Sequence, residues 1–402
     1  MSRICKVFGS LLLKNSNLTY QAGVVMSLTW IWQHLEWPRF TWNNEALSSS
    51  LREVTQLQGK LLGKIELIPQ EAENASVLDA QLQNIIQSSA IEGEYLDAES
   101  VRSSLAKRLG VKDAGLSSVT AQTEGLANLI LDATQNYNQA LSLDRLFQWH
   151  TYLFPEQNNN NFSLQTIKVG QLRGDEPMQV VSGPHQKRTV HFQAPPRDGL
   201  EEELHAFLAW LSTSRDDKVL DPILRAAQAH LWFITLHPFD DGNGRLARAV
   251  SDYALAQGEQ QSIRYYAMAA SIMENRKGYY EILERTQKSD EDITAWMSWF
   301  LETFRHTLEA ALVRIDIVLR KSRFWQRHGQ DGLKPEQIKI LNRLLDAGLD
   351  GFEGGLTAGK YQRMAKVSKA TATRHITDLL EKQCICKLAG GGRSTHYEIN
   401  WP

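Results

Sequence analysis

The sequence predicts a mainly α-helical protein with two small β-hairpins. Three observations support this fold class. Apolar residues recur at three- and four-residue steps over most of the chain; one pair of β-prone runs interrupts the middle; and a second pair follows three helical patterns near the end. At 402 residues the chain exceeds what one hydrophobic core usually organises, so two or three domains are expected.

The first 25 residues differ from the rest of the chain. They contain basic residues and a short apolar run that Gly9 and Ser10 interrupt, without a convincing cleavage site. A loosely ordered or non-native leader over residues 1–25 is therefore expected rather than a secretory signal. A plausible start follows at Met26, and the aromatic segment WIWQHLEWPRFTW begins at Trp30. Its tryptophans are expected to pack in a core.

An N-terminal helical domain is expected over residues 26–115. Residues 43–92 are rich in helix formers, and one amphipathic helix is indicated by the apolar series Leu51, Val54, Leu57, Leu61 and Ile65. Further helical patterns cover residues 100–109, 117–135 and 143–153.

The middle of the chain changes character after a run of asparagines. Residues 178–181 and 189–192 are β-prone and are joined by a connection that contains glycine and proline, which predicts a hairpin. Helical patterns then resume over residues 200–211, 222–236, 245–257, 277–286 and 293–320.

The C-terminal part has the element order of a winged helix-turn-helix. Helices are expected at 335–345, 356–365 and 369–383, followed by strands at 385–388 and 394–399 around a triple-glycine turn. Residues 334–402 are therefore expected to form this module.

Composition excludes some classes of protein. The 44 basic residues nearly balance 46 acidic ones, so the chain lacks the global positive field of a dedicated nucleic-acid binder. Its three cysteines, Cys5, Cys384 and Cys386, show no zinc spacing and fit a reducing compartment. No apolar run is long enough for a membrane helix. A cytoplasmic location without a membrane partner is expected.

The stretch HPFDDGNGRLAR has the chemistry of a phosphate site. Gly242, Asn243 and Gly244 lead into a helix whose N-terminal amides can bind an anion. Arg245 and Arg248 lie three residues apart on one face of its first turns. Cations there oppose the helix dipole, and a bound anion would remove the conflict.

Two further residues in this stretch could carry a reaction. Asp241 precedes the glycines, where a carboxylate can hold Mg²⁺ against phosphate oxygens. His237 ends the preceding helix, and imidazole is a suitable general base near neutral pH. A capped surface helix with exposed arginines is the structural alternative, but the combined spacing favours the phosphate site.

Residues 237–248 contain every position of the pattern H-x-F-x-D-G-N-G-R-x-x-R. This pattern resembles the signature of the Fic (Fido) family. The resemblance implies a helical catalytic core, here 116–325, that transfers AMP from Mg-ATP to a Ser, Thr or Tyr hydroxyl. The target is another protein or the chain itself. It also implies that His237 deprotonates this hydroxyl and that Asp241 binds Mg²⁺.

The same resemblance assigns the nucleotide contacts. Gly242, Asn243 and Gly244 would hold the α- and β-phosphates, Arg245 would bind phosphate oxygens, and Arg248 would reach the γ-phosphate. The hairpin occupies the position of the family's target-binding flap, with Met178, Val180, Val181, Val190 and Phe192 as its contact residues. Tyr279 and Tyr280 resemble the segment that lines the adenine pocket, and they could equally be core aromatics.

The sequence SSAIEG resembles the family's inhibitory motif S/T-x-x-x-E-G. By itself it is a helix end with a glycine cap. In a Fic chain, Ser88, Glu92 and Gly93 occupy the motif positions, and Glu92 would compete with ATP for Arg248. Some relatives use this glutamate to position water for AMP removal, so a deAMPylase is an alternative function.

A DNA-binding regulator is the alternative from another functional class. The C-terminal module offers cations for phosphate contacts: Lys366, Lys369, Arg374, Lys382, Lys387 and Arg393. Winged helices also form dimer interfaces, so a second copy of the chain is another expected partner. His230 and His237 lie seven residues apart, but His230 is expected to be a hydrogen-bonded core residue rather than a metal ligand.

Overall fold

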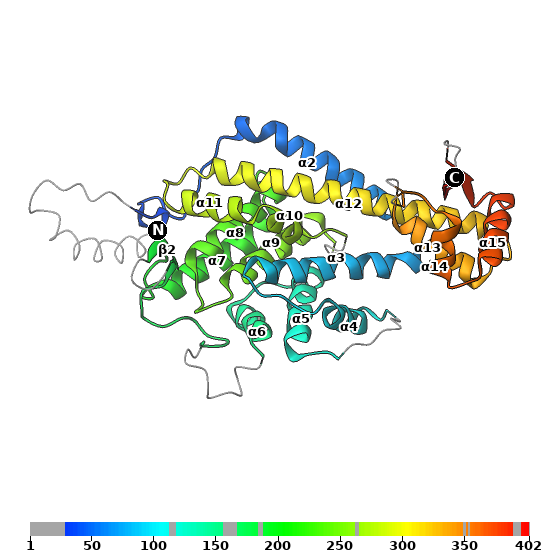
Figure 1. Cartoon of the computed structure of the whole chain (residues 1–402). Helices are drawn as coiled ribbons and strands as arrows, with labels where there is room; N and C mark the ends of the chain where they lie inside the picture. The colour runs from blue at the N-terminus through cyan, green and yellow to red at the C-terminus, as the bar shows by residue number, and fades with distance from the viewer. Residues whose placement is uncertain are drawn as a thin grey trace, which may run out of the picture.

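The computed structural model describes residues 29–111, 118–155, 167–183, 188–261, 265–348, 351–352, 354–388 and 395–401. The expected leader at residues 1–25 lies outside these ranges. The described chain is mostly helical with two short hairpins, which confirms the predicted fold class (Figure 1). Among the described residues, no helix combines the length and apolar character that crossing a membrane requires.

The N-terminal part contains a short 3-10 turn and three helices. These elements are η2 (Ile31–Gln33), α2 (Asn44–Ile65), α3 (Gln70–Ile91) and α4 (Ala98–Leu109). The long stretch of helix formers is two helices because the chain turns before Pro69, which has extended backbone and caps α3. Helix α2 lies along the long helix α12 (Thr294–His328) (Figure 1).

Helices α8 (Pro222–Leu236) and α9 (Asn243–Glu259) pack together at the centre of the molecule. Every α8 residue after its first is buried, as expected for a helix that other helices surround. The surrounding elements are α5 (Ala121–Gln135), α6 (Leu143–Leu153), α7 (Leu200–Thr213), η4 (Ser214–Asp216), α10 (Met268–Glu274) and α11 (Arg276–Gln287). The short helix α10 is absent from the sequence prediction.

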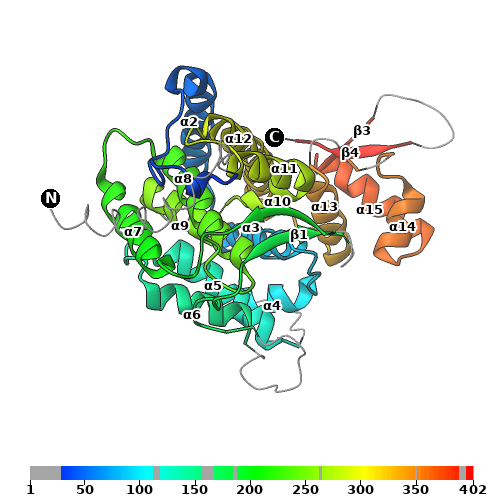
Figure 2. The same ribbon diagram turned by 90° about the vertical axis from the view of Figure 1, so that its left-hand side faces the viewer.

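The predicted central hairpin is present as β1 (Gln179–Ser182) and β2 (Thr189–Gln193). The strands are antiparallel, and the register shifts between Val180 and Val181. The hairpin lies beside α11 (Figure 2). Phe192 is buried and meets the ring of Trp30 edge to face, with the ring centroids 5.5 Å apart. The N-terminal aromatic segment therefore supports the base of the hairpin.

The C-terminal elements are α13 (Pro335–Asp346), α14 (Ala358–Ala365), α15 (Lys369–Glu381), β3 (Ile385–Lys387) and β4 (Tyr397–Ile399). Three helices followed by an antiparallel hairpin is the expected order. These elements share a hydrophobic core of their own, which includes Phe324 from α12, Tyr361 and Ile376. The triple-glycine turn at residues 390–392 lies outside the described ranges.

Candidate functional site

The loop between α8 and α9 is held by one asparagine. The N–H of Phe239 donates to Oδ1 of Asn243 at 3.0 Å, and Nδ2 of Asn243 donates to the carbonyl of Phe239 at 2.8 Å. Gly242 has a φ of 79°, a conformation that favours glycine, just before the first turn of α9. The Asn243 side chain therefore braces the loop, and Asn243 also lines the cavity described below.

His237 caps the end of α8 with a φ of 48°. Its Nδ1 lies 3.2 Å from the carbonyl of Ile234, which places the proton on Nδ1 and leaves Nε2 as an acceptor. Burial, together with the nearby Arg173, lowers the pKa of His237 to about 4. The imidazole is therefore neutral at pH 7, as a general base must be.

Arg173 is a site residue that sequence reasoning missed. It is buried, and its Nε donates to the carbonyl of His237 at 2.9 Å, while Nη2 donates to the carbonyl of Pro195 at 2.6 Å. Its backbone N–H donates to the carbonyl of Pro238. This one residue fixes the backbone under the imidazole, and no spacing in the sequence links it to His237.

His150 supports the same loop from α6. Its Nδ1 accepts the N–H of Gly170 at 2.9 Å, so Nε2 carries the proton and donates to the carbonyl of Asp241 at 3.2 Å. The ring stacks on Phe239 with centroids 4.2 Å apart. Burial lowers the pKa of His150 to about 4, so the ring is neutral. The sequence analysis did not single out His150 for this position.

Both arginines of α9 are buried and paired with anions. Arg248 donates from Nε to Oγ of Ser88 at 2.9 Å, and from Nη2 to Oε1 of Glu92 at 2.8 Å. Arg245 donates from Nη1 to Oε2 of Glu94 at 2.6 Å. Sequence reasoning anticipated Ser88 and Glu92 at this site and missed Glu94.

Glu92 extends from the end of α3 into the start of α9. Burial opposes ionisation of its carboxyl, but Arg248 outweighs this effect and lowers the pKa of Glu92. A Cβ at Gly244 would lie 2.2 Å from Oε1 of Glu92, so only glycine leaves room for the carboxylate. On its other side, Glu92 Oε2 accepts the hydroxyl of Tyr280 at 3.3 Å.

The two tyrosines, which the sequence could place either in the core or at the adenine pocket, differ in burial. Tyr279 is buried, and its hydroxyl lies 3.0 Å from Nε2 of His230. His230 is also buried, as predicted for a core histidine. Tyr280 is 38% exposed, and both tyrosines line the cavity beside Glu92. Tyr280 is therefore the more accessible candidate for a ligand contact, and Tyr279 is also part of the core.

Some of these groups line one cavity of about 750 Å³, a volume in the range of small-molecule sites. Its lining includes Glu92, His237 and Asp241 on one side and the hairpin on the other. The exposed hairpin contacts are Val180, Val181 and Val190. Met178 and Phe192 pack against Trp30 in a small core, and Phe192 also lines the cavity.

Two family models match parts of the chain. Residues 140–255 match the model of the Fic/DOC family. The chain contains a Fic/DOC family domain. Residues 30–111 match a second model, described as a domain of unknown function (DUF4172).

Two curated relatives cover different shares of the chain. A uridine 5'-monophosphate transferase of Xanthomonas campestris pv. campestris is 35% identical over 121 residues, which are 29% of this chain and 21% of that protein. A protein adenylyltransferase Fic of Nematostella vectensis is 25% identical over 280 residues, 67% of this chain and 59% of that protein. The chain thus spans about a fifth and about three fifths of these relatives' lengths.

A solved structure supports the fold assignment. The crystal structure of a Fic family protein from Desulfovibrio desulfuricans aligns with a TM-score of 0.51 at 17% identity. The alignment covers 90% of this chain and 98% of that chain. At this identity the similarity establishes a shared fold.

The start of α9 in the Fic domain suits a phosphate ligand. Among the described residues, buried nitrogens without a hydrogen-bond partner include Nε of Arg245 and Nη1 of Arg248. Asp241 is exposed at the cavity, and its Oδ1 accepts the N–H of Gly242 at 2.6 Å. Unpaired guanidinium nitrogens on α9 and the Asp241 carboxylate at the cavity fit a phosphate group and Mg²⁺.

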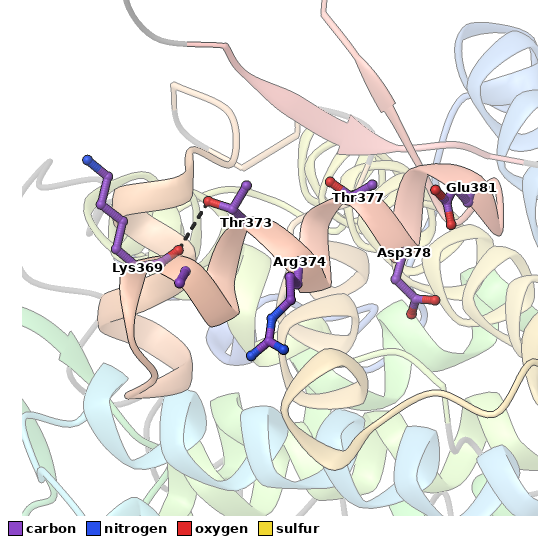
Figure 3. A pocket seen from close by; sticks show the side chains of 7 residues that line it. Lys369, Thr373, Arg374, Thr377, Asp378 and Glu381 are labelled. Carbon is purple, nitrogen blue, oxygen red and sulfur yellow. Dashed lines mark hydrogen bonds between the residues drawn. The ribbon is translucent and has the colours of Figure 1, made fainter.

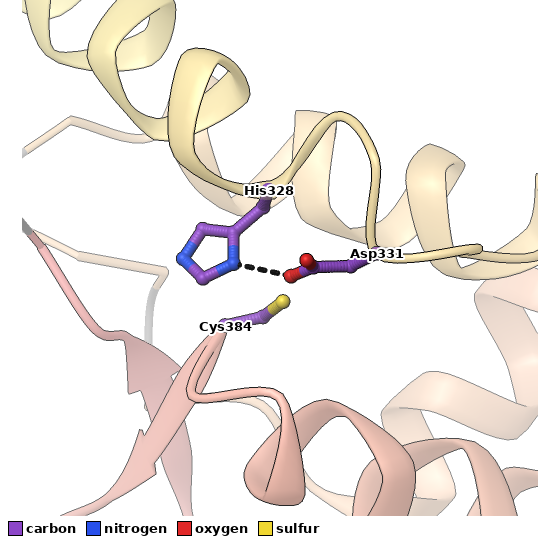
Figure 4. A group of neighbouring side chains, drawn as sticks. All are labelled: His328, Asp331 and Cys384. Atoms are coloured by element: carbon purple, nitrogen blue, oxygen red, sulfur yellow. Dashed lines mark hydrogen bonds and ion pairs between the residues drawn. The ribbon is translucent and has the colours of Figure 1, made fainter.

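A group of three side chains outside the Fic domain also has potential metal ligands (Figure 4). Ligand atoms of His328, Asp331 and Cys384 lie within 4.8 Å of one another in the described structure. Nδ1 of His328 hydrogen-bonds to Oδ2 of Asp331 at 2.7 Å, and burial raises the pKa of the Cys384 thiol to about 11. With a protonated thiol, this group is a polar contact that joins the end of α12 to the C-terminal module.

Proposed function

We propose that the Fic domain transfers AMP from Mg-ATP to the hydroxyl of a Ser, Thr or Tyr side chain. The target is another protein or the chain itself, and Glu92 inhibits the reaction. The observation that carries this proposal is a neutral His237, with Nε2 as acceptor, that lines one cavity together with Glu92, whose carboxylate binds the buried Arg248 of α9.

The residues of the site support a simple sequence of bond changes. His237 Nε2 accepts the proton of the target hydroxyl, and the hydroxyl oxygen forms a bond to the α-phosphorus. The bond from that phosphorus to the bridging oxygen breaks, and pyrophosphate leaves. The backbone amides at Gly242–Gly244 would stabilise the phosphates through the helix N-terminus. Asp241 would hold Mg²⁺, which neutralises phosphate charge.

The hairpin supports a protein rather than a small-molecule acceptor. Val180, Val181 and Val190 are between 36% and 40% exposed, and two of them line the cavity. An extended peptide could pair its main chain with a strand of this hairpin. Recognition through the backbone would place a hydroxyl near His237 with little dependence on neighbouring side chains.

The proposal is tested with Glu92→Gly protein and ATP labelled at either the α- or the γ-phosphate. AMP transfer predicts protein-bound label from α-labelled ATP and none from γ-labelled ATP. Protein-bound γ-label would instead show phosphoryl transfer and contradict the proposal. Because one relative is named a uridine 5'-monophosphate transferase, UTP is tested beside ATP. His237→Ala in the same background is the inactive control.

The reverse reaction is a second outcome for the same site. The Glu92 side chain is 30% exposed and lines the cavity with His237, where it could orient a water molecule toward a bound AMP group. AMP-modified protein is incubated with wild-type and Glu92→Gly chains. Release of AMP by the wild type alone would assign deAMPylation to the wild-type chain.

A DNA-binding role for the C-terminal module has its own structural support. One face of α15 presents Lys369, Thr373 and Arg374 to solvent (Figure 3). Lys366 and Lys387 are exposed beside it. These cations and small side chains suit the first half of a recognition helix in the major groove.

Of the other cations expected for this role, one is paired with a carboxylate and one lies outside the described residues. Lys382 is paired with Asp378 at 2.8 Å, and Arg393 lies outside the described residues. The role is tested with a labelled random DNA duplex at low salt, with wild type, a Lys369→Ala/Arg374→Ala variant and Lys382→Ala as control. Salt-sensitive binding that only the double variant loses supports it; no binding by the wild type contradicts it.

A further inference from the structure

The end of α3 forms a compact turn that directs two carboxylates to the same helix. The N–H of Gly93 donates to the carbonyl of Ala90, and the N–H of Glu94 donates to the carbonyl of Ser89. This pair of bonds is a Schellman motif, in which the glycine has a positive φ, here 86°. The motif fixes Glu92 and Glu94 on either side of Gly93.

Each carboxylate meets a different arginine of α9. Glu92 binds Arg248, and Glu94 binds Arg245 at 2.6 Å. Oε1 of Glu94 also accepts a hydrogen bond from Nε2 of Gln122 in α5. The carboxylate of Glu94 is therefore held between two helices.

Burial makes both pairs necessary in the resting protein. The side chains of Arg245 and Arg248 are only 8% and 5% exposed, and both lie in the first turns of a helix whose dipole disfavours cations. Buried guanidinium groups need anions nearby. A nucleotide triphosphate would supply anions to the same two groups.

We propose that Glu94 is a second inhibitory residue, which holds Arg245 as Glu92 holds Arg248. The inference rests on the proposed nucleotide transfer. ATP must take Arg245 from Glu94 before the α- and β-phosphates can bind at the start of α9. Loss of Glu94 alone therefore leaves Arg245 with an unmet charge and strengthens nucleotide binding.

The alternative is that Glu94 positions Arg245 for the phosphates. The two roles predict opposite effects of losing Glu94 on nucleotide affinity. Affinity for a non-hydrolysable ATP analogue with Mg²⁺ is measured by calorimetry on the full chain. The variants are Glu92→Gly, Glu94→Gln, the double variant and Glu99→Gln, which removes an exposed carboxylate near the same turn. Gln122→Ala removes the second anchor of Glu94 without touching either arginine.

If Glu94 is inhibitory, Glu94→Gln and Gln122→Ala should each bind the analogue about threefold more tightly, or better, than the wild type. The double variant should bind it more tightly than Glu92→Gly, and Glu99→Gln should bind it like the wild type. Thermal unfolding confirms that each variant is folded. Weaker or unchanged binding by folded Glu94→Gln, beside tighter binding by Glu92→Gly, would overturn the inference alone. No binding by any variant would overturn the proposed function.

Discussion

The carboxylate of Glu92 and the guanidinium of Arg248 are joined at 2.8 Å, although 156 residues separate them in the chain. The pair brings the C-cap residue of α3 against the second turn of α9. Arg248 also donates to the side chain and the carbonyl of Ser88, so the end of α3 closes over the start of α9. The start of α9 in the Fic domain is thus linked to an element outside it.

Replacing Glu92 by glycine should activate the protein. The substitution removes the competing anion and the atom that lies against Gly244, so transfer of labelled AMP should rise about 5- to 150-fold, the range of common coupling energies. Glu66→Gly is a matched control, because Glu66 is also the C-cap residue of a helix, while the two α9 arginines pair with Glu92 and Glu94. Equal or lower transfer by Glu92→Gly would refute the inhibitory role.

The pH profile of transfer should report His237. Only the neutral ring accepts a proton, and burial lowers its pKa to about 4, so activity should be lost as pH falls through about 4 rather than 6.5. Among nearby groups, Arg173 lowers this pKa, whereas Glu92 and Asp241 raise it. The Glu92→Gly variant should therefore show an inflection no higher than the wild type. The rate constant is measured from about one pH unit below this pKa up to neutral pH, with circular dichroism to confirm folding.

Arg173→Met should impair the site without removing a group that touches substrate. The change leaves the carbonyls of His237 and Pro195 without their donors, which costs about 1–3 kcal/mol for a buried acceptor. Urea unfolding measures this loss, and transfer in the Glu92→Gly background should fall through kcat. A folded variant with full kcat would show that Arg173 does not position His237.

Residue spacing in the sequence predicts the local part of the site, but it does not predict the contacts that distant segments make on folding. The residues from His237 to Arg248 are adjacent in the chain, so their helix ends and glycine turn could be predicted. Arg173 and Glu94 act on this stretch from distant segments, and no periodicity connects them to it. The role of Asn243 also changes, because its amide hydrogen-bonds to the backbone of Phe239.

The helices also include some that the sequence pattern predicts and some that it does not. Amphipathic patterns predict α2 and α12, whose apolar faces pack on the core, but the seven-residue α10 is too short for a periodic signal. The break before α3 depends on Pro69. The helix formers on both sides of this proline make the segment look like one continuous helix.

Gly93→Ala should activate the protein less than Glu92→Gly. A Cβ at this position meets no atom within 4 Å, so the cost is conformational: a φ of 86° is unfavourable for alanine by about 1–2 kcal/mol. The Schellman motif should loosen, and Glu92 and Glu94 should bind their arginines less well while both carboxylates remain.

The matched control for Gly93→Ala is Gly63→Ala. A Cβ at Gly63 also meets no atom within 4 Å, but Gly63 lies within α2 and has no positive φ. Alanine there should stabilise the helix and leave transfer unchanged. AMP transfer and analogue affinity are measured for both variants beside the wild type. Since the two inhibitory contacts depend on one turn, a folded Gly93→Ala protein with wild-type transfer and affinity would show that the turn does not hold them in place.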